Sequence, residues 1–276
     1  PPPPPSPTHT PTTEIYTRQS SSAASDVYKR QIPPTEDFKQ ACAEFGIEFD
    51  QGEKEHLYVF LDILYEANQT TNLTAIKDEK EAWMRHIFDA LTLLPVLTEI
   101  EPVEGAPLKV CDVGSGGGVP AFPLAIVRPD AQFTLVEATG RKAELLNSFA
   151  EKLGLKNITI ENGRAEQLGA FKTGKFRDVF DIVTARALGR IAVAAELCVP
   201  LAQEGGLIAL IKGQKAEEEL EEAKQALHML HTTHTGTLDT PTGKIVVLEK
   251  SRRTPKIYPR RDGEPKRSPL GVGKKA

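Results

Sequence analysis

The sequence that decides the fold is Leu108-Lys109-Val110-Cys111-Asp112-Val113-Gly114-Ser115-Gly116-Gly117-Gly118-Val119-Pro120. An apolar run ends in an acid and breaks into four glycines, after which apolar residues resume at helical density between Pro123 and Val127. This pattern predicts a strand, a tight turn and a helix. In an open α/β sheet, ligands bind in the crevice beyond the carboxyl end of such a strand. We therefore expect a binding site at this loop.

The spacing of the glycines separates two kinds of binding loop. A dinucleotide-binding loop has the pattern G-x-G-x-x-G, which would need a glycine where this chain has Val119. The alternative, acid-x-Gly-x-Gly-x-Gly, is met in full by Asp112, Gly114, Gly116 and Gly118. That spacing is typical of class I S-adenosylmethionine-dependent methyltransferases. A glycine-rich loop without a ligand is the least favoured interpretation, because the glycines directly follow a buried strand.

The rest of the chain alternates strands with helices. Strands are expected at residues 132–137, 157–160, 180–184, 206–211 and 244–248, and helices at 140–153, 190–198 and 215–230. Such alternation predicts a mostly parallel, doubly wound sheet, here a methyltransferase domain of residues 105–250. Upstream, Thr35 resembles a helix cap, and residues 53–69 and 78–94 place apolar side chains on one helical face. Residues 35–104 are therefore expected to form an N-terminal helical extension.

The two ends of the chain differ from its middle in composition. Residues 1–34 form a Pro/Ser/Thr-rich leader without apolar periodicity, which we expect to be disordered and foreign to the fold. Residues 250–276 hold ten Lys or Arg and two acids, although the whole chain has a net charge of −4. This basic tail, residues 251–276, suits a polyanionic partner or, equally, a frayed and solvated terminus.

Composition also excludes several classes of protein. Cys42, Cys111 and Cys198 lie far apart and form no C-x-x-C motif, so they frame neither a disulfide scaffold nor a zinc site. His228, His231 and His234 lack supporting carboxylates or thiols, and we expect no metal. The apolar runs are too short to span a bilayer. We expect a cytoplasmic monomer that does not contact a membrane.

Candidate cofactor contacts follow the second and third expected strands. Glu137 ends the strand after the glycine loop, where an acid can accept hydrogen bonds from both ribose hydroxyls. This position fits an adenosyl cofactor without separating S-adenosylmethionine from NAD. Gly163-Arg164-Ala165-Glu166 follows the third strand, and the backbone of Ala165 and Glu166 could recognise an adenine edge.

The fourth strand ends at the usual position of the reacting centre. Methyltransferases that act on exocyclic amines often have an Asn/Asp-Pro-Pro-aromatic turn here, whereas this chain has Arg186. Guanine N7 is already an unprotonated acceptor, so it can attack a methyl group without a general base. Arg186 and Lys212 are candidates for positioning cofactor or RNA, and a surface salt bridge is the alternative for each. His86 and Asp89 could be a base and its orienter, but a structural hydrogen-bonded pair is the more common arrangement.

Several motifs occur together in a fixed order. They are Asn72-Leu73-Thr74, Arg85-His86-Ile87, Asp112 to Gly118, Gly163 to Glu166, Asp181 to Ala187, Leu210 to Gly213, and Thr254-Pro255-x-x-Tyr258-Pro259-Arg260. Over about residues 36–270 this set resembles the RsmG (GidB) family of bacterial small-subunit ribosomal RNA guanine-N7 methyltransferases.

The resemblance implies S-adenosylmethionine as cofactor and a guanine of 16S rRNA, free or in the small ribosomal subunit, as target. It places cofactor contacts on Gly114, Val119, Ala165 with Glu166, and Arg186. Val119 is smaller than the residue often found there, so weaker apolar packing is expected. Two other functions stay open from the residues alone: an oxidoreductase with a dinucleotide-binding domain, and a non-catalytic RNA-binding factor that retains a cofactor pocket.

Overall fold

The computed structural model describes residues 32–102 and 104–271. The chain divides into two units, residues 1–30 and 31–276, and the fold below is that of the second. Apart from residues 32–34, the expected disordered leader lies outside the described residues. Ile32 is buried, and its carbonyl accepts a hydrogen bond from the Trp83 indole at 2.7 Å. The ordered fold therefore includes residues before Thr35.

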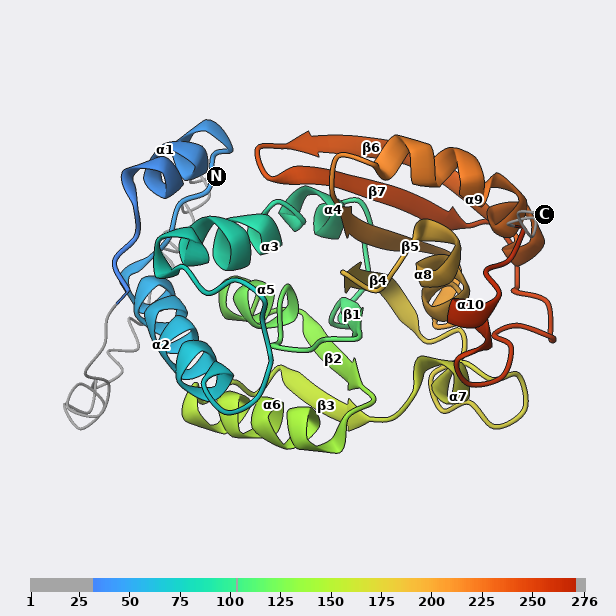
Figure 1. The fold of residues 1–276 in the computed structure, drawn as a ribbon, viewed down its shortest axis with the longest axis horizontal. Helices are drawn as coiled ribbons and strands as arrows, with labels where there is room; N and C mark the ends of the chain where they lie inside the picture. Colours follow the sequence, from blue (N-terminus) through green and yellow to red (C-terminus); the bar gives the residue numbers. More distant parts are fainter. Residues whose placement is uncertain (1–31, 103, 272–276) are drawn as a thin grey trace, which may run out of the picture. The chain divides into compact units, whose positions relative to one another are not determined.

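Within the described residues, seven strands form one sheet in the order β3-β2-β1-β4-β5-β7-β6 (Figure 1). The strands are β1 (Lys109–Val113), β2 (Gln132–Glu137), β3 (Ile158–Asn162), β4 (Phe180–Arg186), β5 (Ala202–Lys212), β6 (Thr232–Thr240) and β7 (Gly243–Lys250). β1 to β5 pair in parallel, whereas β7 is antiparallel to both β5 and β6. The strand order reverses between β1 and β4, which places a topological switch point beside the glycine loop. The expected mostly parallel, doubly wound sheet is confirmed.

Two groups of helices pack around this sheet. In one group α5 (Ala121–Val127) and α6 (Gly140–Lys152) contact the strands β2 and β3 and the N-terminal helix α2. In the other group α8 (Ile191–Cys198) packs against α9 (Ala216–Leu230), α7 (Ala165–Leu168) and α10 (Glu264–Arg267), as Figure 1 shows. Apolar side chains of α8 and α9 share a buried cluster with β1, β4 and β5, so the central strands are covered by apolar contacts.

The N-terminal helices are continuous with the main domain. α1 (Glu36–Glu44) begins at the expected cap Thr35, and α2 (Gln51–Asn68) begins with a reciprocal capping box between Asp50 and Glu53. Phe60 of α2 stacks on Phe122 of α5, with ring centroids 5.4 Å apart. The extension therefore forms part of the core that supports the glycine loop.

The prediction of a single regular helix at residues 78–94 is wrong. The structure divides it into η1 (Glu79–Glu81), η2 (Trp83–Phe88), α3 (Asp89–Leu91) and α4 (Leu94–Thr98), of which η2 is a π-helix. π-helical turns are rare and are frequently found at functional sites. The wider turn lies where His86 meets the end of β4, which local sequence periodicity could not indicate.

Strand β6 was not expected from the sequence. Its residues are polar and mostly exposed or half-buried, because it is the outer strand and is held by its ladder with β7. Such an edge strand lacks the apolar alternation that marks a half-buried strand. Among the described residues no helix is long and apolar enough to cross a membrane.

The basic tail packs on the domain as far as residue 271. Tyr258 and Leu270 are buried. The guanidinium of Arg177 donates to the carbonyls of Thr254 and Tyr258 at 2.7 and 2.8 Å. These contacts contradict a frayed terminus for the described part of the tail and bring it to the edge of the parallel strands.

Candidate functional site

The loop after β1 takes a conformation that only glycine adopts without strain. Gly114, Gly116 and Gly118 have φ values of 72°, 54° and 83°. A Cβ on Gly118 would lie 2.3 Å from the Phe122 ring, and one on Gly114 would lie 2.8 Å from Leu188. A Cβ on Gly116 would meet its nearest atoms, two carbonyl oxygens, at an ordinary contact distance of 3.8 Å. Packing therefore requires glycine at positions 114 and 118, whereas at position 116 the positive φ alone favours it.

Glu137 holds the glycine loop in place. One of its carboxylate oxygens accepts the Gly116 N–H at 3.0 Å, and the other accepts the Thr139 N–H at 2.8 Å. The residue is buried, and each oxygen has a further lone pair. The side chain expected to bind a ribose thus also couples the end of β2 to the loop after β1.

Asp112 has the only orphaned carboxylate oxygen of the described site. Its Oδ1 accepts a hydrogen bond from the Thr184 hydroxyl at 2.9 Å, but the buried Oδ2 has no partner. Burial raises the pKa of Asp112 to about 6, although the hydroxyls of Ser115 and Thr184 and the charge of Arg186 act in the opposite direction. Asp112 does not line the cavity described below, so its buried carboxylate can act on a ligand at the loop only through its electrostatic potential.

A cavity of about 280 Å³ opens beyond the carboxyl ends of β1, β2 and β4. Gly114, Ala165 and Glu166, three of the predicted cofactor contacts, line it, and so do Val113, Ala138, Leu188, Gly263, Pro265 and Lys266. Gly116, Gly118 and the buried Val119 lie in the loop after β1, and Glu137 ends β2. These four residues and Arg186 are not among those that line the cavity. Apolar walls with convergent backbone groups are typical of a small-molecule site.

These features fit an adenosyl cofactor. The apolar walls suit a nucleoside base, Ala165 and Glu166 line the cavity, and Glu137 accepts the Gly116 N–H of the loop. The orphaned Asp112 oxygen provides negative potential at the same loop. A neutral or cationic adenosyl compound therefore matches the residues present better than a ligand with a pyrophosphate, because two carboxylates adjoin the loop.

Arg186 reaches across to the N-terminal extension at the end of β4. Its guanidinium donates to the Arg85 carbonyl at 2.5 Å and to Nδ1 of His86 at 3.4 Å, and it lies 3.9 Å from the Asp89 carboxylate. Asp89 in turn accepts a hydrogen bond from the Thr242 hydroxyl. The expected hydrogen-bonded pair of His86 and Asp89 is therefore replaced by separate contacts with Arg186.

His86 is a poor base in this environment. The ring is fully buried, and its Nε2 lies 3.3 Å from the Thr74 hydroxyl. Burial, together with the charges of Arg186 and Arg85, lowers the pKa of His86 to about 3. The imidazole is consequently neutral at physiological pH, and with Nδ1 facing a guanidinium it acts as a hydrogen-bond acceptor for Arg186.

Lys212 is held by the protein itself. Its ammonium lies 2.6 Å from both the Gly189 carbonyl and the Glu219 carboxylate, and its side chain is only 11% exposed. These contacts favour the structural alternative for Lys212 over an RNA contact.

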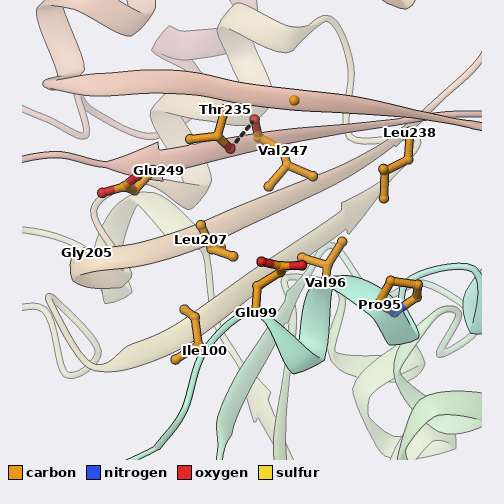
Figure 2. A pocket seen from close by; sticks show the side chains of 11 residues that line it. Pro95, Val96, Glu99, Ile100, Gly205, Leu207, Thr235, Leu238, Val247 and Glu249 are labelled. Atoms are coloured by element: carbon orange, nitrogen blue, oxygen red, sulfur yellow. Dashed lines mark hydrogen bonds between the residues drawn. The ribbon is translucent and has the colours of Figure 1, made fainter.

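A larger cavity of about 440 Å³ lies elsewhere, between α4 and strands β5, β7 and β6. Figure 2 shows Val96 and Glu99 facing Leu207 and Val247 across it. It opens near Gly205, on the amino-terminal part of β5, and its lining includes no residue of the glycine loop. Size alone therefore does not identify the site.

Strand order, glycine loop and cavity together define the class. A parallel sheet with one antiparallel strand inserted beside β5, an acid-x-Gly-x-Gly-x-Gly loop after β1 and an acid ending β2 make this a class I S-adenosylmethionine-dependent methyltransferase.

Comparison with known proteins identifies the family. The family described as "GidB: rRNA small subunit methyltransferase G" matches residues 53–244. The ribosomal RNA small subunit methyltransferase G of Sorangium cellulosum is 45% identical over 230 residues, which cover 83% of this chain and 93% of that protein. Its counterparts in Staphylococcus haemolyticus and Oceanobacillus iheyensis are 37% and 38% identical, with 83% and 85% of this chain and 94% and 98% of theirs covered. The chain belongs to this family, and it is an enzyme.

Two functional features escaped sequence reasoning. One is the contact of Asp89 with Thr242, which lie 153 positions apart. The other is the lining of the cavity by Gly263, Pro265 and Lys266. The motif ending at Arg260 indicated that the tail resembles that of a known family. It did not indicate which surface of the domain the tail covers, because the local sequence of a basic segment carries no such information.

Proposed function

We propose that this enzyme transfers the methyl group of S-adenosylmethionine to N7 of a guanine in 16S rRNA of the small ribosomal subunit. The main observation in support of this proposal is the set of contacts at the end of β4, where His86 and Asp89 both face Arg186. The printed names of the relatives, with small-subunit rRNA as their substrate, support the choice of RNA.

The contacts at the end of β4 favour an acceptor that needs no deprotonation. An exocyclic amine must lose a proton during methylation, but Arg186 is a permanent cation and His86 has a pKa of about 3. Asp89 is occupied by Arg186 and Thr242. Guanine N7 offers a lone pair directly, so catalysis reduces to alignment and electrostatics.

The cofactor supplies an electrophilic methyl group on a cationic sulfur. We assign its binding to the backbone of the glycine loop, the carboxylate of Glu137, the 165–166 turn and the side chain of Arg186, with Val119 packing behind the loop. The full set is Gly114, Gly116, Gly118, Val119, Glu137, Ala165, Glu166 and Arg186. In this arrangement the loop excludes water from the reacting centre, and Arg186 orients the target or its phosphate.

RNA recognition would depend on the exposed cations of the tail. Arg252, Arg253, Lys256, Arg261, Lys266 and Arg267 are all exposed on the described segment. Affinity should therefore fall steeply with salt. The target guanine must be unstacked to reach a cavity of this kind. A monomer acting in the cytoplasm, where ribosomal subunits are assembled, is consistent with this proposal.

A transfer assay with mapping tests the proposal. The full chain is incubated with radiolabelled S-adenosylmethionine and either naked 16S rRNA or small subunits, and the RNA is then treated with borohydride and aniline. This treatment cleaves the strand at N7-methylguanosine but not at guanines methylated on the exocyclic amine. Label at a single guanine that becomes a cleavage site supports the proposal.

Three outcomes contradict it at different levels. Label without cleavage would retain the enzyme class but reject N7. Binding of cofactor and RNA without transfer would favour a non-catalytic RNA-binding factor. Binding of NAD in place of S-adenosylmethionine would reject the cofactor.

A further inference from the structure

The segment of residues 260–267 lies against the cofactor cavity. Gly263, Pro265 and Lys266 belong to its lining, together with Gly114 and Ala165 of the predicted cofactor site. Pro265 is buried, whereas Gly263 is half-buried and Lys266 is exposed. Figure 1 shows α10 beside α8, next to α7. Residues more than 90 positions apart in the chain therefore share one cavity.

The segment is fastened to the turn proposed to recognise adenine. Oε1 of Glu166 accepts the Gly263 N–H at 2.8 Å and a guanidinium N–H of Arg164 at 2.9 Å. Asp262 accepts a hydrogen bond from Gln167 at 2.7 Å and lies 3.4 Å from Arg164. The side chain of Glu166 thus binds the segment, while its backbone stays at the cavity.

A second anchor lies on α8. The guanidinium of Arg260 forms a bidentate pair with Glu196, at 2.8 and 2.6 Å, and the Arg260 N–H donates to the same carboxylate at 3.0 Å. Glu196 is fully buried. Fork-like pairs of this kind fix geometry as well as charge, so the segment has one defined position across the cavity.

We infer that residues 260–267 form a wall of the cofactor site, so that Gly263, Pro265 and Lys266 are cofactor-binding residues. This inference rests on the proposed cofactor function of the cavity. The docked segment lines one side of the cavity, so a nucleoside bound there would contact it. By linkage, cofactor bound against the wall also stabilises the segment in its docked position.

Hydrogen exchange on the unmodified full chain tests this coupling. With S-adenosylhomocysteine as the probe, the Gly263 amide and its neighbours are expected to exchange about tenfold more slowly. Strand β6, which does not line the cavity, is the internal control and should exchange at the same rate with and without probe. Equal exchange of residues 260–267 in both conditions would overturn the inference.

Two variants test whether residues 260–267 contribute to the affinity for the cofactor. Asp262→Ala removes an exposed anchor, and Pro265→Ala removes part of the wall; each should raise the dissociation constant for S-adenosylhomocysteine about three- to tenfold. The matched control is Glu221→Ala, which removes a carboxylate from an exposed ion pair with Lys224 outside the cavity and should change nothing.

The failures can be told apart. Wild-type protein that does not bind the probe would reject the proposed function itself. Wild-type protein that binds it, with both variants retaining wild-type affinity, would overturn only the wall.

Discussion

Replacing Asp112 by Asn isolates the cost of burying one carboxylate. The carboxylate accepts a hydrogen bond from Thr184 through Oδ1, and its Oδ2 is buried without a partner. An Asn side chain has nearly the same shape and keeps an oxygen for Thr184, but it has no charge to desolvate. The variant therefore removes the titration of this group while preserving its packing.

The magnitude follows from the pKa of Asp112, which rises from 3.8 to about 6 on folding. Because the folded value is the higher one, the fold favours the protonated acid, so the wild-type protein loses stability as the pH rises from about 4 through about 6. The difference corresponds to about 3 kcal/mol. The unpaired Asn amide adds a cost that does not depend on pH, so the change with pH is the quantity to measure.

Urea unfolding of both proteins between about pH 4 and pH 7.5 measures this change. The free energy of unfolding of Asp112→Asn relative to wild type should increase by about 2 to 3 kcal/mol over that range, or roughly 5–10 °C in melting temperature. Asp130→Asn is the control, because Asp130 is exposed and Arg128 lowers its pKa. A stability difference that stays constant with pH would refute the reasoning. We also expect weaker cofactor binding in Asp112→Asn, because the loop loses its negative potential.

Four further outcomes are expected. Because burial lowers the pKa of His86 from 6.5 to about 3, the wild-type protein should lose stability as the pH falls below about 6.5, and His86→Gln should show a smaller loss in urea titrations. Arg186→Lys keeps the charge but not the guanidinium fork that contacts the Arg85 carbonyl and His86, and it should lower the single-turnover methylation rate on the order of 100-fold; an unchanged rate would remove Arg186 from the reacting centre. The double variant Lys212→Met/Glu219→Gln should bind RNA within about twofold of wild type in filter binding, because these charges contact each other; a large loss would restore Lys212 as an RNA contact. Joint replacement by Ala of three exposed cations outside the cavity lining should lower RNA affinity and flatten its salt dependence by about three phosphate contacts, with cofactor affinity as the unchanged control; the residues are Arg252, Arg253 and Arg261.

Deletion of the whole tail is a poor test of RNA binding alone. On charge alone, removing residues 250–276 would be expected to weaken RNA binding and leave cofactor affinity nearly unchanged. The structure changes this expectation, because Gly263, Pro265 and Lys266 line the cavity and Arg260 neutralises the buried Glu196. Such a deletion should reduce cofactor affinity and stability as well.

Local patterns in the chain predicted the sheet and the cofactor loop. Residues 132–137 were expected as a strand and form β2 with the same bounds, because alternating apolar residues have few other ways to be buried. The glycines at 114, 116 and 118 marked a loop with positive φ, since other residues are strained there. These features depend on interactions between residues a few positions apart, which can be read directly from the sequence.

Contacts between distant positions were decided by the tertiary structure. Arg186 at the end of β4 contacts Arg85 and His86 of the π-helix at residues 83–88, and Asp89 directly after it. Burial in this contact, together with the charge of Arg186, lowers the pKa of His86 and makes it a poor base. No periodicity in either segment encodes the approach of the other.

The tail shows the same division between sequence and structure. Charge counting established that residues 250–276 are basic, which suggested an RNA-binding terminus. Only the packed chain places Pro265 in the cavity wall and Arg260 on the buried Glu196. The composition of a segment determines which kind of partner it can bind. The surface on which it packs depends on which charged and apolar groups the rest of the folded chain presents to it.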